Sequence, residues 1–186
     1  GKYWINNQAT NLSDGTALEV RGMHVVDEDN IYIAGNEFSL TTFRTLAQYW
    51  YNGELHVLTD GMLNAEANGI FADGADVYVA GYEKKSASDF QNVAKYWKND
   101  VAKPLTTGEF TANAFSVFVD KDDVYVAGEE NNGTVNVAKY WKNGKEKALT
   151  DGTKHASATS ITVIDGDVYV CGTETVDSKP IAMYWI

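Results

Sequence analysis

Apolar and polar residues alternate along short stretches of this chain, and most of these stretches end at glycine or at turns rich in Asp and Asn. Residues 123–128 show the pattern, because valine and tyrosine alternate in Asp-Val-Tyr-Val-Ala-Gly and glycine closes the run. Alternation with a period of two is typical of β-strands. No stretch of about 10–12 residues has the apolar spacing of a helix. The pattern predicts an all-β protein.

The strand pattern repeats along the chain. The dipeptide Tyr-Trp occurs five times and contains every tryptophan. The five occurrences are Tyr3-Trp4, Tyr49-Trp50, Tyr96-Trp97, Tyr140-Trp141 and Tyr184-Trp185. Their spacings of 46, 47, 44 and 44 residues are typical of stacked supersecondary units. Residues 1–186 are therefore expected to form one domain of four repeats.

Each repeat contains four short strands. Asn52-Gly53 and Asn143-Gly144 follow the Tyr-Trp strands, and an Asn-Gly pair favours a two-residue hairpin turn. Asp-rich turns such as 120–123 join the first and second strands. Each repeat is predicted to be an antiparallel sheet whose strands follow one another in sequence.

Four such sheets are predicted to form a four-bladed β-propeller, because stacking around a ring buries both faces of each small sheet. The chain ends with a third strand, residues 181–186, while residues 11–15 resemble a fourth strand. We expect the N-terminal strand to join the C-terminal blade and close the ring. An open array, or part of a larger propeller, is the alternative, since Tyr3-Trp4 duplicates the final Tyr-Trp pair.

The motifs Ala-Lys-Tyr-Trp-Lys-Asn-Gly, Leu-Thr-Asp-Gly and Asp-Val-Tyr-Val-Ala-Gly resemble a repeat family of exported or lipid-anchored bacterial proteins of uncharacterised function. The resemblance covers the whole chain, although the first repeat departs most from it. It implies a propeller fold and a periplasmic or cell-surface location, with any leader or anchor outside this sequence. It supplies no catalytic residues.

Composition and motifs exclude several kinds of partner and chemistry. The formal charge of -11 argues against nucleic acid, which requires clustered Lys and Arg. No apolar run is long enough for a transmembrane helix. The three histidines lack metal-ligand spacing, and no nucleophile elbow or phosphate-binding loop is present, so we expect no metal and no cofactor. Cys171 occupies a position held by alanine in the other repeats, and is expected to be a small buried residue.

The connections between second and third strands are the long, variable ones, and they are expected to share a face with the connections between blades. These predicted loops span residues 36–46, 82–93, 129–137 and 173–181. One glutamate per repeat lies at the start of each loop: Glu37, Glu83, Glu130 and Glu174. These carboxylates could bind a cation or a polyhydroxylated ligand, or pair with Lys95 and Lys139 on the adjoining strand. Asp14, Asp60 and Asp151 lie on the same face, in turns that favour Asp for backbone reasons.

The first repeat differs from the others ahead of its first apolar run. Glu19-Val20-Arg21 aligns with Ala-rich segments such as 65–67, and this alignment predicts that a Glu and an Arg point toward the central channel. Arg21 could bind an anionic group there, or the pair could simply neutralise itself. His24 was aligned with Ile70 and is expected to lie in the core.

Aromatic residues lie in the first two predicted loops: Phe38, Phe43, Tyr82 and Phe90. Flat rings with polar neighbours suit stacking on sugars or packing against a protein. They could also fold back onto their own blade.

Three functions are consistent with these features. The first is a monomeric, non-enzymatic module that binds a glycan or protein through the variable loop face. The second is a glycoside hydrolase or lyase, for which Glu19 and Glu37 would be the carboxylates and Arg21 their electrostatic partner. The third is a structural or adhesion unit of a surface assembly.

Overall fold

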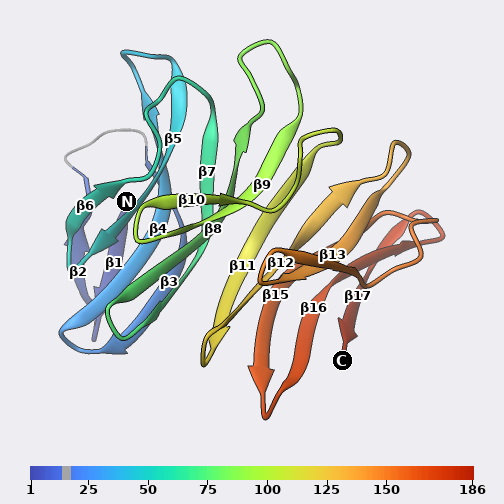
Figure 1. Cartoon of the computed structure of the whole chain (residues 1–186). Helices are drawn as coiled ribbons and strands as arrows, with labels where there is room; N and C mark the ends of the chain where they lie inside the picture. The colour runs from blue at the N-terminus through green and yellow to red at the C-terminus, as the bar shows by residue number, and fades with distance from the viewer. Residues whose placement is uncertain (14–17) are drawn as a thin grey trace.

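The computed structural model describes residues 1–13 and 18–186 and contains only antiparallel sheets in this part of the chain. The prediction of an all-β fold is confirmed (Figure 1). Blade one consists of β3 (Leu18–Asp27), β4 (Asn30–Ser39), β5 (Arg44–Tyr51) and β6 (Glu54–Val57). Blade two consists of β7 (Ala65–Asp73), β8 (Asp76–Lys84), β9 (Asn92–Lys98) and β10 (Val101–Pro104). Blade three consists of β11 (Ala112–Asp120), β12 (Asp123–Asn131), β13 (Asn136–Lys142) and β14 (Lys145–Ala148).

The two ends of the chain form smaller sheets. Blade four has the three strands β15 (Ala156–Ile164), β16 (Asp167–Val176) and β17 (Lys179–Trp185). At the N-terminus, β1 (Lys2–Ile5) and β2 (Gln8–Asn11) pair with each other as a hairpin. The predicted hairpin turns are confirmed, because Asn52 and Asn143 adopt positive φ angles of 50° and 51° and a positive-φ glycine follows each of them.

Alternation along the strands gives each blade two different apolar faces. We call the side that carries the tyrosines of β8 and β9, or their equivalents, the tyrosine face. The opposite side, with the valines and the tryptophan, is the tryptophan face. In blade two, Tyr78 and Ala80 belong to the tyrosine face, whereas Val79 and Trp97 belong to the tryptophan face.

The tyrosine face of each blade packs on the tryptophan face of the next. Tyr32 and Tyr49 of blade one contact the cluster that contains Trp97 of blade two. The same arrangement joins blade two to Trp141 of blade three, and blade three to Trp185 of blade four. Alanines such as Ala67 allow this close approach on the first strands, because a larger residue there would hold the blades apart.

A β-bulge in the first strand of every blade marks the point where neighbouring blades come closest. A Cβ atom added to Gly69 would lie 2.6 Å from the backbone oxygen of Phe115, so only glycine fits there. At the next junction Ser116 takes the equivalent place, and its hydroxyl accepts a hydrogen bond from the Ile161 amide at 3.4 Å. The bulge thus lies at the same position in each junction, but the residue that follows it differs between glycine and serine.

The N-terminal hairpin packs as the outer half of another blade. Tyr3 and Leu12 contact the tryptophan face of blade one beside Ile33 and Trp50. The Leu12 amide donates to the Gly1 carbonyl at 3.0 Å, and the Leu58 amide donates to the Ala47 carbonyl in the same way in blade one.

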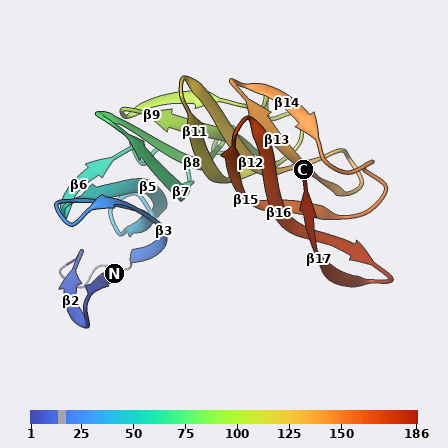
Figure 2. The ribbon, with the colours of Figure 1, turned by 90° about the horizontal axis from the view of Figure 1, so that it is seen from below.

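The predicted ring closure is not formed in this structure. β17 is an edge strand, and β2 pairs with β1 rather than with β17. The physical reason is that β1 carries its own Tyr-Trp pair and fills the third-strand position beside β2. Figure 2 shows the blades side by side along an arc that is open on one side, with the two chain ends at its opposite ends.

Cys171 is exposed, contrary to the prediction that it would be buried. Its position matches that of the buried alanines, but it lies on the tyrosine face of blade four, which has no neighbour. In the described part of the chain, no helix is long and apolar enough to cross a membrane.

Stacking of the blades predicts that equivalent tryptophans contribute unequally to stability. Trp141 is buried between blades two and three, whereas Trp4 is mostly exposed on the outer side of the N-terminal hairpin. Trp141→Ala is expected to lower the free energy of unfolding by about 3–5 kcal/mol. Trp4→Ala is expected to change it by less than about 0.5 kcal/mol. Urea denaturation measures both, and similar losses for the two variants would contradict the packing described.

Candidate functional site

The turns between second and third strands lie beside the connections between blades and form one face of the molecule, here called the loop face. Each turn is anchored to the following connection by one backbone amide. The three bonds run from Thr45 to Asn64 Oδ1 (2.9 Å), from Asn92 to Thr111 Oγ1 (2.9 Å) and from Asn136 to His155 Nδ1 (3.1 Å). His155 therefore has a structural role, as an acceptor at the third junction.

The predicted loops are shorter in the structure because the strands extend into them. Glu37 and Phe38 belong to β4, and Tyr82 and Glu83 belong to β8. The fourth loop, predicted over residues 173–181, is only the two-residue turn Asp177-Ser178, and both residues adopt positive φ. Longer turns remain in the first three blades.

The repeated glutamates mostly pair with the neighbouring strand, as the structural interpretation predicted. Glu83 binds the Lys95 ammonium at 2.6 Å, and Glu130 binds the Lys139 ammonium at 2.6 Å. In blade one, Gln48 replaces the lysine and donates to Glu37 at 3.4 Å. In blade four, Met183 occupies the lysine position beside Gly172, so Glu174 has no equivalent partner on β17.

The strand register corrects the alignment of the first repeat by one residue. Glu19 is opposite Asn36 and matches Glu66, while Arg21 is the bulge residue and matches Asn68. His24 therefore matches Phe71 rather than Ile70. Blade one has a second irregularity, between Val25 and Asp27, that the other blades lack. This extra residue shifts the first repeat by one position when the alignment is counted back from the Asp-rich turn.

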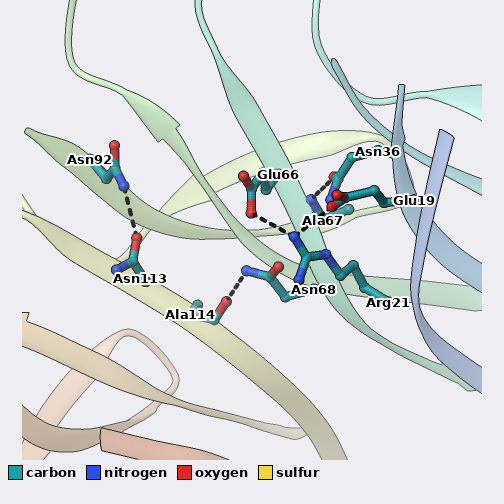
Figure 3. A network of polar contacts seen from close by, with 9 residues as sticks. All are labelled: Glu19, Arg21, Asn36, Glu66, Ala67, Asn68, Asn92, Asn113 and Ala114. Carbon is teal, nitrogen blue, oxygen red and sulfur yellow. Dashed lines mark hydrogen bonds and ion pairs between the residues drawn. The ribbon is translucent and has the colours of Figure 1, made fainter. Parts of the chain in front are cut away.

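Arg21 and Glu19 form an ion pair at 2.6 Å, and a second carboxylate, Glu66, lies 3.8 Å from the same guanidinium (Figure 3). The hydroxyl of Tyr82 is also close, and burial together with its hydrogen bond to Glu66 raises the pKa of Tyr82 above its usual range. Tyr82 thus stays protonated and can donate. Two carboxylates around one arginine leave little net positive charge for an anionic ligand.

Two clefts of the loop face lie at blade junctions, one at each of the first two junctions. The cleft between blades one and two has a volume of about 380 Å³, and the cleft between blades two and three has a volume of about 350 Å³. The first is lined by Leu18, Glu19, Arg21, Asn36, Phe38, Thr45 and Glu66. Asn36 is buried, and its Oδ1 accepts a hydrogen bond from the Ala67 amide at 2.6 Å. The charged side chains that line the first cleft are therefore already paired with one another.

Amide side chains continue this polar network toward the next junction (Figure 3). Asn68 donates to the Ala114 carbonyl at 3.0 Å, and Asn92 donates to the Asn113 side chain at 2.9 Å. These bonds join blade two to blade three and fix the positions of the strand ends that border the second cleft.

The second cleft is lined by Phe90, Gln91, Phe110, Thr111 and Asn131. Phe90 is 88% exposed, and the Lys84 ammonium lies 5.6 Å from the centre of its ring. Of these residues only Phe90 was predicted from the sequence. Phe110 could have been noticed, because the equivalent positions in the neighbouring repeats are Leu63 and Lys154.

Phe43 lies at the tip of the turn between β4 and β5, exposed and with a positive φ of 54°. This conformation is unfavourable for a bulky side chain. The Phe43 amide donates to the Ser39 carbonyl at 2.8 Å, which holds the turn closed. The ring is thus presented to solvent at an energetic cost to the fold.

The remaining predicted residues have structural surroundings. Asp60 and Asp151 accept hydrogen bonds from amides two residues ahead, both at 2.9 Å, as expected of turn residues. Asp14 lies outside the described residues. His24 packs on Phe71 in a tilted arrangement with a centroid distance of 4.4 Å, and burial lowers its pKa. Among residues 1–13 and 18–186, no group of three or more His, Cys, Asp or Glu side chains is arranged to hold a metal ion.

Comparison with known proteins gives no matching family model and no significantly similar curated protein.

The backbone of Phe43 leads to a prediction about stability. Phe43→Gly is expected to raise the free energy of unfolding by about 0.5–1 kcal/mol, because glycine adopts positive φ without steric conflict. Phe90→Gly is the matched control: Phe90 is equally a loop phenylalanine but lacks a positive φ, so no gain is expected. Urea denaturation measures the free energy of unfolding of both variants. A lower free energy of unfolding for Phe43→Gly would contradict the claim that Phe43 is strained.

Proposed function

We propose that this chain is a non-enzymatic binding module that recognises a neutral glycan through the second cleft of the loop face. The exposed Phe90 ring beside amide and hydroxyl side chains is the observation that carries the proposal. Aromatic rings stack on the apolar faces of sugars, while Gln91, Thr111 and Asn131 offer both donors and acceptors for hydroxyl groups.

The charge of the molecule favours a neutral ligand. The formal charge is -11, and acidic glycans would be repelled at long range. The lysines nearest the glutamates of the loop face are engaged, because Lys95 and Lys139 each bind a carboxylate at 2.6 Å. At the second cleft, the Lys84 ammonium donates to the Asp89 carbonyl at 3.5 Å and lies over the Phe90 ring, so it is engaged as well.

The glutamates have surroundings that support binding better than hydrolysis. A glycosidase needs two carboxylates in different environments. Glu19 is paired with Arg21, and Glu37 accepts from Gln48, so both candidates have protein partners. We assign both carboxylates a structural role, in which they hold neighbouring side chains of blade one in place at the loop face.

We also propose that the blades belong to a β-propeller and that the protein is exported. Three equivalent junctions and the curvature of the stack support the propeller (Figure 2). An exported location is implied by the repeat family that the motifs resemble, and it suits a protein that binds glycans.

A glycan array of neutral oligosaccharides, probed with the labelled chain, tests the function. Phe90→Ala and Phe110→Ala are each expected to weaken binding of the recognised glycan about tenfold, which corresponds to about 1.4 kcal/mol. Leu40→Ala, an exposed apolar residue on the turn of blade one, is the control and should bind as the unmodified chain does. Binding that survives both phenylalanine substitutions would refute the assignment of the cleft, and absence of any bound glycan would refute the proposed function.

A further inference from the structure

Blade four leaves an apolar face without a neighbour. Its tyrosine face carries Tyr169, Cys171, Ala182 and Tyr184, at positions that are buried or half-buried in the other blades. Tyr184 is 74% exposed, whereas Tyr140 at the equivalent position of blade three is 8% exposed. The difference arises because no blade follows blade four in the described structure.

Blade one leaves the complementary face partly open. Its first strand, β3, places Val20, Met23 and Val25 on the tryptophan face, and all three are exposed. Met23 is 55% exposed, while Ile70 at the equivalent position of blade two is 7% exposed. The N-terminal hairpin covers only the outer strands of this face, beside Trp50.

The three junctions show what covers each kind of face. A tyrosine face is covered by the tryptophan face of the next blade at every junction of the chain. The free tyrosine face of blade four and the open tryptophan face of blade one are therefore of the two kinds that pack together within the chain. Side-chain size also fits, because Thr162 of blade four replaces the larger Phe71 and Phe118 of the preceding blades. Phe118 packs on the cluster that contains Ile161, which is equivalent to Met23, so the smaller Thr162 leaves room for the longer Met23 side chain.

Blade four has three strands in the described structure, and the N-terminal hairpin contains a strand that suits the fourth position. β1 reads Lys-Tyr-Trp-Ile, and β17 ends in Met-Tyr-Trp and is followed by Ile186, so the two segments are near copies. In the hairpin, Tyr3 is opposite Thr10 and Trp4 is opposite Ala9. β2 could form the same ladder with Tyr184 and Trp185, and the Leu12 amide could then donate to the Ala182 carbonyl as Leu149 donates to Ala138.

We propose that two copies of this chain associate head to tail. The tyrosine face of blade four of one copy packs on the tryptophan face of blade one of the other, and β2 of the second copy adds to β17 as the fourth strand. β17 takes the place of β1, which is released. Within one chain the two faces lie at opposite ends of an open arc, so a second copy supplies what the first cannot reach (Figure 2). Such a head-to-tail contact can close into a ring.

Charge determines how this association depends on salt. Each copy carries a formal charge of -11, so two copies repel each other at low ionic strength. The contact itself is mainly apolar. Association is therefore expected to strengthen as salt is raised, which distinguishes it from an interface held by ion pairs.

Disulfide trapping tests the arrangement. At the junction of blades three and four, the Ser116 hydroxyl lies 3.4 Å from the Ile161 amide. The equivalent pair at the proposed contact is Ser160 of one copy and Met23 of the other. We suggest the double variant Ser160→Cys/Met23→Cys in a Cys171→Ala background, with Ser116→Cys/Ile161→Cys in the same background as the control for junction geometry.

The proposal predicts that the control pair oxidises within one chain, whereas the test pair gives disulfide-linked dimers or longer chains on a non-reducing gel. Each single-cysteine variant should lose most of that product, and so should the test pair with Tyr184→Asp added. A disulfide formed only within one chain would overturn the proposal, because the ring would then close on itself. Test-pair thiols that stay free while the control pair oxidises would also overturn it, as would equal cross-linking by the single-cysteine variants.

Discussion

Each sheet in this protein has two apolar faces and no helix to cover either of them in the described structure. A four-stranded sheet of this size cannot bury both faces alone. The tyrosine face of one blade must therefore pack on the tryptophan face of the next, and every other feature depends on this contact. It places alanine, glycine or serine where the first strands approach, and it buries Trp50, Trp97 and Trp141 almost completely.

The same contact positions the candidate site. Because neighbouring blades stack in register, the turn of one blade lies beside the connection that leads into the next. Single amide bonds, such as that from Asn92 to Thr111, hold the two segments together. Phe90 from one segment and Phe110 from the other then border one cleft. A binding site at a blade junction needs only changes in the turns, while the repeated strands stay the same.

Local features of the sequence predicted the strands and turns well. The spacing of Tyr-Trp predicted four repeated blades, because each blade carries the same strand pattern. The Asn-Gly pairs predicted the hairpin turns, because this signal acts within a few residues. The pairing of Glu83 with Lys95 was also anticipated from adjacent strands. The exposure of Cys171 and the pairing of β1 with β2 were not, since they depend on whether a neighbouring blade is present. The position of His24 was misassigned by one residue because blade one has an extra residue between Val25 and Asp27 that the other blades lack. Phe110 was overlooked because its role at the cleft arises only across a junction.

Hydrogen exchange measured by mass spectrometry at concentrations where the chain is monomeric tests the central claim most directly. β8, β12 and β16 all begin with Asp-Val-Tyr-Val, so their intrinsic exchange rates are nearly the same. If stacking of neighbouring blades supplies the stability, the amides of β8 and β12 should exchange much more slowly than those of β16, which has a neighbour on one face only. Equal protection of β12 and β16 would contradict the account.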